Sequence, residues 1–419
     1  MTGVYSTPDA PPARPATRLG KFLTAWLNLW PSVRLGTWLS LIGVFYWMTA
    51  IQFDAGRPDF YYLADAFLHG RTWLEHAVTA WDSIVVGGHA YVPFAPLPAI
   101  VLAPLVALLG TAAAVDLQPV TNAALGVAAL WLTWRLSARL GVEDHRQRAW
   151  LVILMGLSTP LWWVVQRGGV WHQGQIMVTV LTLLALNEAF GRRRAGVLGI
   201  LAGLSFLARP TLIAAVPYWA WRSGVITARA TVRVIARAGG LVSTGAAAGV
   251  LIALWYDAVR FGRPLESGYG LAVLPAFLEV QREQGLFSLS HLPMNVDYWL
   301  LHLPRFNADF PWLRGDGFGL SVFIASPGLL SALRVRLDRE AIPLALTAAL
   351  VMVPNLLYYG GGWYQFAFRY ALDAYPFVIA LCALAVARRG LGWRWRAVIM
   401  LGVLVNLSGV YWGYLANGS

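Results

Sequence analysis

Charged residues and cysteine are both scarce in this chain of 419 residues. Asp, Glu, Lys and Arg together make up 12% of it, whereas apolar residues make up 58% and the mean hydropathy is +0.58. A soluble domain carries roughly 25% charged residues, so we expect one integral membrane domain. The single cysteine, Cys382, lies inside an apolar run, which excludes a disulfide framework and a thiolate metal site.

The sequence also lacks the local motifs of several enzyme classes. It contains no phosphate-binding glycine loop, no nucleophile elbow and no His/Cys/Asp cluster with metal-ligand spacing. We therefore predict no metal site from the residues, while a need for a divalent metal stays open. Nucleic acid is excluded as a partner, because the net charge of +12 is spread over loops between apolar runs rather than over one soluble surface.

Lysine is nearly absent, and the many arginines follow a pattern along the chain. Six clusters hold 22 of the 32 basic residues, at positions 14–34, 135–148, 192–194, 222–237, 334–339 and 388–396. Cytoplasmic loops of membrane proteins carry an excess of Arg and Lys, so we place all six clusters inside. The preference for Arg over Lys is typical of a GC-rich prokaryote, whose cell membrane would then hold the protein.

Long apolar runs between the clusters predict the membrane spans. A spanning helix needs about 20 predominantly apolar residues, fewer if it is kinked. Nine runs are candidates, at residues 35–52, 119–137, 150–165, 175–190, 241–256, 319–333, 342–358, 375–387 and 397–415. Residues 1–30 are expected to form a disordered cytoplasmic tail. We predict no cleavable signal peptide there, because the first apolar run starts late and is long enough to span.

Two further apolar stretches are assigned by keeping every cluster on one side. Residues 196–221 have arginines at both ends and are too short for two full crossings at 1.5 Å per residue. Because Pro210 cannot continue a helix, we predict two short helices that meet at an apex carrying Arg209. Residues 93–110 contain four prolines, and counting them as a crossing would put the next arginine cluster outside. A re-entrant or interfacial segment is therefore expected.

The predicted fold is an all-α polytopic bundle in a single domain, residues 31–419. It has about eleven traverses, counting the two short helices, with the N-terminus inside and interfacial helices in the first outer loop. Four connections then face outward, at residues 53–116, 166–174, 257–317 and 359–374. They contain 14 of the 20 acidic residues and, with Arg209, only ten basic ones. A site on the outer face would therefore have many carboxylates and few cations.

The first outer loop holds the candidate catalytic carboxylates. Residues 60–68 predict an amphipathic helix whose Tyr and Phe side chains suit the headgroup region, and Tyr62 on it is a candidate substrate contact. Asp59 immediately precedes this helix, while Asp54 and Asp82 lie elsewhere in the same loop. The alternative role for Asp59 is to cap the helix.

Aromatic residues and one arginine gather in the last outer connection. After three glycines come Trp363, Gln365, Arg369 and Tyr370. This composition suits an anionic headgroup or a sugar, because sugars stack on aromatic rings and bond to planar polar groups. The alternative is an aromatic belt at the membrane surface in which Arg369 pairs with Asp373, four residues along a helix.

Three further residues are candidates for substrate binding. Arg209 lies at the predicted apex, where a buried arginine is costly unless it faces protein, water or an anion. Arg263 lies near the start of the long connection 257–317, and His172 lies in the short connection 166–174. A lone histidine such as His172 is more often a satisfied interfacial residue than a ligand.

The order of these parts resembles the C-type glycosyltransferase superfamily, polytopic enzymes that use lipid-linked sugars. It is most similar to the prokaryotic relatives of protein O-mannosyltransferases and aminoarabinose transferases. The resemblance covers residues 30–415. The parts that carry it are residues 62–70 (YLADAFLHG), 91–98 (YVPFAPLP), Ala208-Arg209-Pro210, 261–269 (FGRPLESGY) and Arg369-Tyr370 before Pro376.

The resemblance implies an inverting sugar transfer on the outer face. The donor would be a polyprenyl-phosphate sugar embedded among membrane lipids, and the acceptor stays open between protein, lipid and glycan. In the family an acid of the first outer loop acts as general base, and Asp59 lies nearest to that position. Phe60 stands where the family has the second acid of an Asp-Glu pair, so Asp54 and Asp82 stay candidates.

The resemblance also bears on the carrier phosphate. Related enzymes often have a lysine before the Pro-rich segment to hold that phosphate, and Val92 stands at this position here. The phosphate would then be held by Arg209, Arg369 or Arg263. Arginine suits this role because its guanidinium binds phosphate oxygens in pairs.

Two other functions stay open. Ion-coupled transporters and flippases commonly place ionisable groups at mid-membrane, whereas the predicted spans contain almost none apart from Arg209. A non-catalytic membrane protein of the same fold is the third interpretation, and the missing Asp-Glu pair keeps it open.

The predicted topology is tested by labelling residue 141, which follows the second arginine cluster. A cysteine placed there is expected to react with a membrane-impermeant maleimide only after the membrane has been opened, because that cluster is predicted to lie inside. Labelling in intact cells would overturn the topology.

Overall fold

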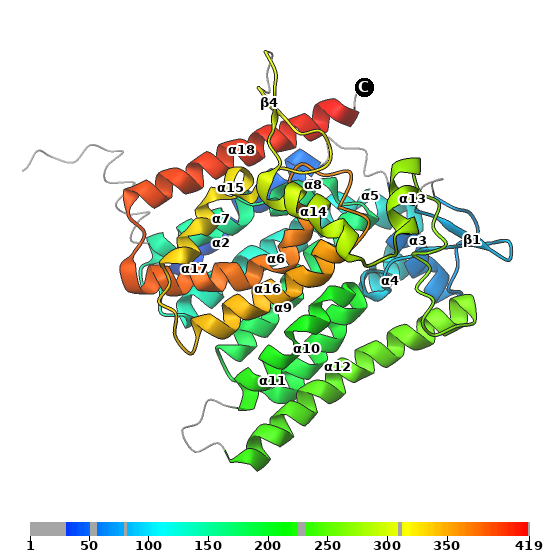
Figure 1. Ribbon diagram of the computed structural model, residues 1–419, viewed down its shortest axis with the longest axis horizontal. Helices are drawn as coiled ribbons and strands as arrows, with labels where there is room; N and C mark the ends of the chain where they lie inside the picture. The colour runs from blue at the N-terminus through cyan, green and yellow to red at the C-terminus, as the bar shows by residue number, and fades with distance from the viewer. Residues whose placement is uncertain (1–30, 51–56, 79–81, 225–230, 309–311, 418–419) are drawn as a thin grey trace, which may run out of the picture.

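The computed structural model describes residues 31–50, 57–78, 82–224, 231–308 and 312–417. The predicted tail 1–30 and the candidate base Asp54 lie outside the described residues. Helices dominate the described chain and pack side by side in one bundle (Figure 1).

The bundle helices follow the predicted apolar runs. Their bounds are α2 Pro31–Ala50, α6 Gln118–Arg139, α7 His145–Leu157, α8 Leu161–Arg167, α9 Val170–Ala189, α10 Ala195–Ala208, α11 Val216–Gly224, α12 Val232–Phe261, α16 Ala341–Leu357, α17 Tyr375–Arg389 and α18 Trp393–Asn417. Among the described helices, α12 and residues 393–412 of α18 are long and apolar enough to cross a membrane. The α7–α8 pair, bent by 50° at its break, would be a third such span. The count of eleven traverses therefore stays a prediction.

The span predicted at residues 319–333 is wrong as a single helix. The structure has the four-residue helix α15 (Val322–Ala325), followed by the 3₁₀ helix η4 (Pro327–Arg334). Pro327 interrupts the helical ladder, because it has no N–H and disfavours helical backbone at the residue before it. The side-chain amide of Asn406 on α18 donates to the Ala325 carbonyl at 2.6 Å, which provides a partner at the break.

The stretch 196–221 breaks at Arg209-Pro210, as predicted from the proline. Helix α10 ends at Ala208, Arg209 is extended, and the chain continues as the 3₁₀ helix η1 (Pro210–Ala215) and then α11. The stretch 93–110 forms α4 (Leu97–Leu109). Its 13 residues rise only about 20 Å, less than the roughly 30 Å of a bilayer core.

The all-α prediction missed two small hairpins. Strand β1 (Ile84–Val86) pairs with β2 (His89–Tyr91), and β3 (Arg305–Phe306) pairs with β4 (Leu313–Arg314), both antiparallel. The first turn is Gly87-Gly88, with φ of 59° and 80°. This two-residue glycine turn is a hairpin signal that the sequence contained.

Helices α10 and α12 approach each other through small residues. Gly199 and Gly203 of α10 face Gly245 and Gly249 of α12, and a Cβ on any of the four would overlap backbone of the other helix. This spacing of small residues is the usual way in which helices approach closely in membranes. It holds α12 against α10, the helix that Arg209 follows.

Helix α9 is the central element, since it packs against α6, α8, α10 and α17. It begins at Val170, after Gly168 has closed α8 in the left-handed conformation (φ 61°). The turn places Trp171 in the first turn of α9 and Gln175 one turn further.

The long connections gather at one end of the bundle. Helix α3 (Asp59–Leu68), α4 and the β1–β2 hairpin come from the first loop, and α13 (Ala276–Glu283) comes from the loop after α12. Figure 1 shows these elements together beside the end of α12 that leads into the second loop. Segments more than 150 residues apart in the sequence thus meet there, as the hydrogen bond from the Asp82 amide to the Val273 carbonyl illustrates (2.8 Å).

Candidate active-site cavity

A cavity of about 700 Å³ lies where these connections meet the bundle. Its wall combines the first turn of α9, the Arg209-Pro210 break, the last turns of α12 and α16, and the 3₁₀ helix η5 (Arg369–Asp373). Three arginines line it, namely Arg209, Arg260 and Arg369. Arg209 and Arg369 are both candidates from the sequence, and the structure brings them together from positions 160 residues apart.

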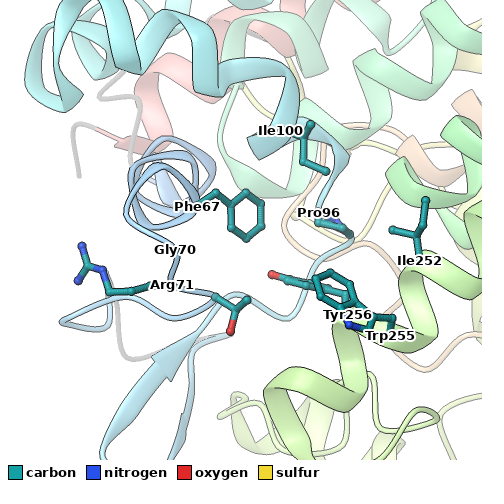
Figure 2. A pocket seen from close by; sticks show the side chains of 9 residues that line it. Phe67, Gly70, Arg71, Pro96, Ile100, Ile252, Trp255 and Tyr256 are labelled. Atoms are coloured by element: carbon teal, nitrogen blue, oxygen red, sulfur yellow. The ribbon is translucent and has the colours of Figure 1, made fainter.

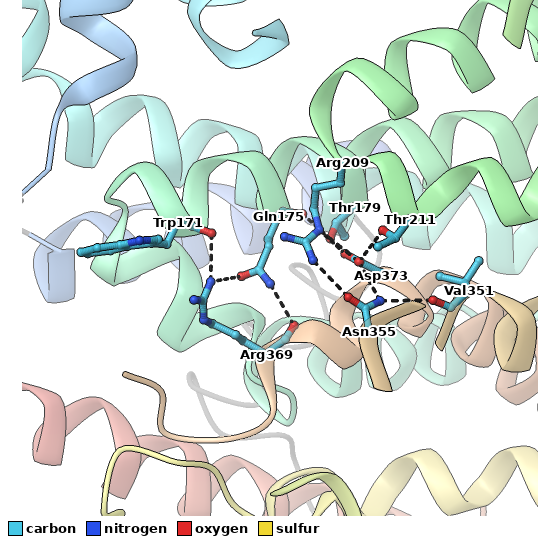
Figure 3. A network of polar contacts seen from close by, with 9 residues as sticks. All are labelled: Trp171, Gln175, Thr179, Arg209, Thr211, Val351, Asn355, Arg369 and Asp373. Atoms are coloured by element: carbon cyan, nitrogen blue, oxygen red, sulfur yellow. Dashed lines mark hydrogen bonds and ion pairs between the residues drawn. The ribbon is translucent and has the colours of Figure 1, made fainter. Parts of the chain in front are cut away.

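Arg209 is neutralised by a buried carboxylate. Its Nε lies 2.8 Å from Oδ1 of Asp373, whose side chain is fully buried. Thr211 donates its hydroxyl to Asp373 Oδ2 at 2.8 Å. The amide of Asn355 donates to the same oxygen at 3.0 Å and accepts from Arg209 Nη2 at 3.3 Å. Figure 3 shows this network converging from η1, α16 and η5.

Arg369 is buried without a carboxylate. Its Nε donates to the Gly362 carbonyl at 3.0 Å, and its Nη1 donates to the Trp171 carbonyl at 3.0 Å and to Oε1 of Gln175 at 3.3 Å. Gln365 accepts from the Arg369 backbone N–H at 2.9 Å. Among the described residues no acid lies within ion-pair distance of this guanidinium. Its charge therefore lacks a formal counter-ion, and burying such a charge is costly without one.

The alternative in which Arg369 pairs with Asp373 is wrong. Asp373 binds Arg209 instead, because residues 369–373 form a 3₁₀ helix. With three residues per turn, positions i and i+4 lie on different faces, whereas an α-helix would have aligned them.

Tyr370 lies between the two cations. Its ring centroid is 5.2 Å from the guanidinium carbon of Arg209 and 5.0 Å from that of Arg369. An aromatic face attracts a cation, so the ring keeps two positive side chains close together. Both arginines and Tyr370 line the same cavity.

Trp171 joins the cavity to the first loop. Its indole N–H donates to Oδ2 of Asp82 at 2.7 Å, and the guanidinium carbon of Arg57 lies 4.7 Å from its ring centroid. Its carbonyl accepts from Arg369. A carboxylate and a buried guanidinium thus contact opposite ends of one residue.

Asp59, the leading candidate base from the sequence, forms an ion pair with Arg57. Arg57 donates to both of its carboxylate oxygens, at 2.6 and 3.0 Å, and both side chains are buried. Asp59 does not line the cavity. The N-cap position of α3 is Pro58 rather than Asp59, and no side chain there caps the helix by a hydrogen bond. The carboxylate of Asp59 therefore serves as the counter-ion that holds Arg57 against Trp171.

Asp82, unlike Asp59, is bound by the indole N–H of Trp171 rather than by an arginine. Its backbone has a left-handed φ of 54°, which residues other than glycine adopt rarely and which is enriched at functional sites. Burial raises the pKa of its carboxyl, while the Trp171 N–H and the charges of Arg57 and Arg369 oppose that rise. Asp82 is thus a partly buried acid that accepts a hydrogen bond from a wall residue of the cavity but does not line the cavity itself.

Arg260 is the cavity arginine that sequence analysis missed. It is buried near the end of α12, donates to the Val92 carbonyl at 2.7 Å and forms an ion pair with Asp257 one turn earlier. Val92 stands where the resemblance implies a lysine, and the guanidinium of Arg260 on α12 contacts its backbone carbonyl. The signal available in the sequence was an Asp-x-x-Arg pair at the end of an apolar run.

The other predicted contacts lie elsewhere. Arg263 and Tyr62 are exposed and absent from the wall, and Trp363 is 38% exposed and packs on Phe277 with ring centroids 5.0 Å apart. His172 is buried beside Trp163 and does not line the cavity either.

Gln365 is also buried outside the wall, and its amide is engaged by protein. Its Nε2 donates to the carbonyls of Phe318 and Gly361 at 2.6 and 2.8 Å, while its Oε1 accepts from the Arg369 amide. The described residues contain no group of three or more His, Cys, Asp or Glu side chains that could hold a metal.

A second pocket of about 370 Å³ adjoins the cavity and shares Pro96 and Tyr256 with it. Figure 2 shows Phe67 and Ile100 on one side and Ile252 and Trp255 of α12 on the other. Its wall is mostly apolar, so it suits hydrocarbon rather than a charged group.

Comparison with known proteins leaves the family of the chain open. No family model and no curated protein matches it. Among solved structures, it is similar to the oligosaccharyltransferase of Archaeoglobus fulgidus in the apo form, with 15% identity and a TM-score of 0.47. The match covers 91% of this chain and 55% of that one, so the chain spans about half the length of that protein.

The Arg209–Asp373 pair yields a stability prediction. Asp373→Asn is expected to lower the free energy of unfolding by about 3 kcal/mol, because it leaves a largely buried guanidinium without a counter-ion. Thermal unfolding in detergent measures the change. The control is Glu75→Gln, which removes an exposed partner of Arg71 and should have little effect; equal losses in both variants would contradict the prediction.

Proposed function

We propose that the chain is a glycosyltransferase of the cell membrane that moves a sugar from a polyprenyl-phosphate donor to a hydroxyl acceptor on the outer face, with inversion. The observation that carries this proposal is the buried guanidinium of Arg369 in the wall of a large cavity, linked through Trp171 to the carboxylate of Asp82. One residue thereby connects a phosphate-binding charge to a proton acceptor.

The donor phosphate would bind at Arg369 and Arg209. Arg209 is already neutralised by Asp373, so the net positive charge at this part of the wall is that of Arg369. An anionic phosphate supplies the missing counter-ion, and a guanidinium binds its oxygens in a charge-assisted, bidentate manner. The same charge stabilises the phosphate as it departs.

The polyprenyl tail would leave the cavity on its apolar side. Ile213, Leu350 and Val353 line it there and are 40–51% exposed. Ile213 lies in η1, immediately after the Arg209-Pro210 break, where α10 ends. Because such side chains favour hydrocarbon, this opening suits a lipid substrate whose headgroup is polar and whose tail stays in the bilayer.

We assign the general base to Asp82, which does not line the cavity itself but accepts from the indole N–H of the wall residue Trp171. Among the described acids, Asp257 does line the cavity, but it is paired with Arg260. The acceptor hydroxyl oxygen forms a bond to the anomeric carbon while the bond from that carbon to the phosphate oxygen breaks. The hydroxyl proton goes to the Asp82 carboxylate, and the electron pair of the broken bond leaves with the polyprenyl phosphate. A carboxylate whose pKa is raised toward the working pH accepts such a proton more readily. A single displacement inverts the sugar.

Asp82→Asn is expected to lower sugar transfer at least a hundredfold, the usual range for loss of a general base. In the wild type the rate should fall as the pH drops through the raised pKa of Asp82, since protonation removes the acceptor. Transfer from a radiolabelled polyprenyl-phosphate sugar in proteoliposomes is measured against pH.

Two companion variants separate the acids of the first loop. Asp116→Asn changes an exposed acid of that loop and should leave the rate unchanged, whereas Asp59→Asn should slow transfer but keep the acid limb of the pH profile. Full activity in Asp82→Asn would remove Asp82 from the base role. Donor translocation without transfer in the wild type would favour the flippase.

Arg369→Gln is expected to weaken binding of a short-chain polyprenyl phosphate at least tenfold, because the uncompensated charge is lost. Isothermal titration in detergent measures the affinity. Arg263→Gln is the matched control, since Arg263 is exposed and outside the cavity wall. Equal affinities of the wild type and Arg369→Gln would refute the phosphate assignment.

A further inference from the structure

A histidine in the loop after α12 is held between two carboxylates. His302 follows the short π-helix η3 (Asp297–Leu301). Its Nδ1 lies 2.8 Å from Oδ2 of Asp297, and its Nε2 lies 2.9 Å from Oδ2 of Asp316. A neutral imidazole has one N–H and one lone pair, so it can donate only one of these bonds. With both carboxylates ionised, the two bonds together require the imidazolium cation.

The surroundings of His302 contain few other charges. Arg305 on β3 lies 3.7 Å from Asp316, and the ring of Tyr298 on η3 packs edge-on against the imidazole at 5.6 Å. Helix α15, which also packs against η3, consists of apolar residues. The side chain of His302 is 20% exposed, so its proton can exchange with solvent.

Hydrogen bonds lead from this histidine to Arg369. Asp316 accepts from the Phe318 amide through Oδ1 at 3.0 Å. The carbonyls of Gly317 and Phe318 then accept from the backbone N–H and the side-chain Nε2 of Gln365, at 2.8 and 2.6 Å. Gln365 in turn accepts from the backbone N–H of Arg369. The segment that His302 holds is therefore the one against which Arg369 is positioned.

We propose that protonated His302 is a positioning residue: by drawing Asp297 and Asp316 together it fixes Gln365, and through it the guanidinium of Arg369, for anion binding. Deprotonation removes one of the two bonds and loosens the 316–318 segment. Anion affinity then decreases as the pH rises. The inference rests on the proposed role of Arg369 as the phosphate ligand.

The electrostatics agree with this geometry. Burial disfavours the charge on His302, but the hydrogen bonds to Asp297 and Asp316 outweigh it and raise the pKa of the imidazole above its ordinary value. A raised pKa in the folded state stabilises that state fully below about pH 6.5, the ordinary histidine value. The stabilisation is lost as the pH rises through the higher pKa of the folded state. The contact of His302 with Asp297 and Asp316, which we call the His302 clamp, therefore weakens at alkaline pH.

Titration of the full-length protein in detergent with a short-chain polyprenyl phosphate at pH 6 and pH 9 tests the proposal. The wild type should bind several-fold more weakly at pH 9. His302→Gln should bind more weakly than the wild type at pH 6 and lose this difference between the two pH values. His76→Gln, at an exposed histidine of the first loop, should behave as the wild type.

A second variant covers the case in which His302→Gln does not fold. Asp297→Asn removes the more exposed of the two carboxylates and should shift the midpoint of the affinity change to lower pH. The same pH dependence in the wild type, Asp297→Asn and any folded His302→Gln would overturn the role of His302.

Hydrogen exchange separates this inference from the proposed function. Protection of residues 361–369, corrected for the intrinsic pH dependence of exchange, should decrease at pH 9 in the wild type but not in His302→Gln. If polyprenyl phosphate does not bind at either pH, the proposed function fails, while this protection difference still reports the His302 clamp. Equal protection changes in both proteins would refute it.

Discussion

A buried guanidinium without a counter-ion is the constraint on which this architecture depends. Arg369 donates to neutral oxygens of Gly362, Trp171 and Gln175. These bonds orient the guanidinium but do not neutralise its positive charge. In a low-dielectric interior such a charge is tolerated only where protein dipoles or an anion face it. Three elements, α9, η5 and the loop before η5, must therefore keep their relative positions, and the tight packing around α9 ensures that they do.

The three arginines of the cavity differ in whether an acid neutralises their charge. Arg209 and Arg260 each have an acid of their own, Asp373 and Asp257. They shape the wall and add hydrogen-bond donors, while only Arg369 adds net charge. A wall with one uncompensated cation suits a single phosphate group, and the exposed apolar side chains next to the Arg209-Pro210 break suit the hydrocarbon attached to it.

The elements that the sequence predicted well are those with a local cause. Apolar runs of sufficient length became α6, α9, α12 and α16, and Pro210 ended α10 at Ala208 as expected. Residues 319–333 are similarly apolar but contain Pro327, and the proline replaced the expected span by short helical turns. The Gly87-Gly88 hairpin also had a local signal, which a search for helices overlooked.

The sequence by itself determined the class of protein and the chemical types at its site. Hydropathy and arginine clusters predict a membrane bundle, and the aromatic and arginine residues of the predicted outer loops predict a site for an anionic headgroup or a sugar. Only the tertiary structure decided which residues pair. Asp59 pairs with Arg57, and Asp373 pairs with Arg209. Asp82 binds Trp171 instead, and Arg369 has no acid as a partner within the described part of the chain. The physical reason is that ion pairs form between groups that packing brings within a few ångströms, and separation along the sequence does not reveal that distance.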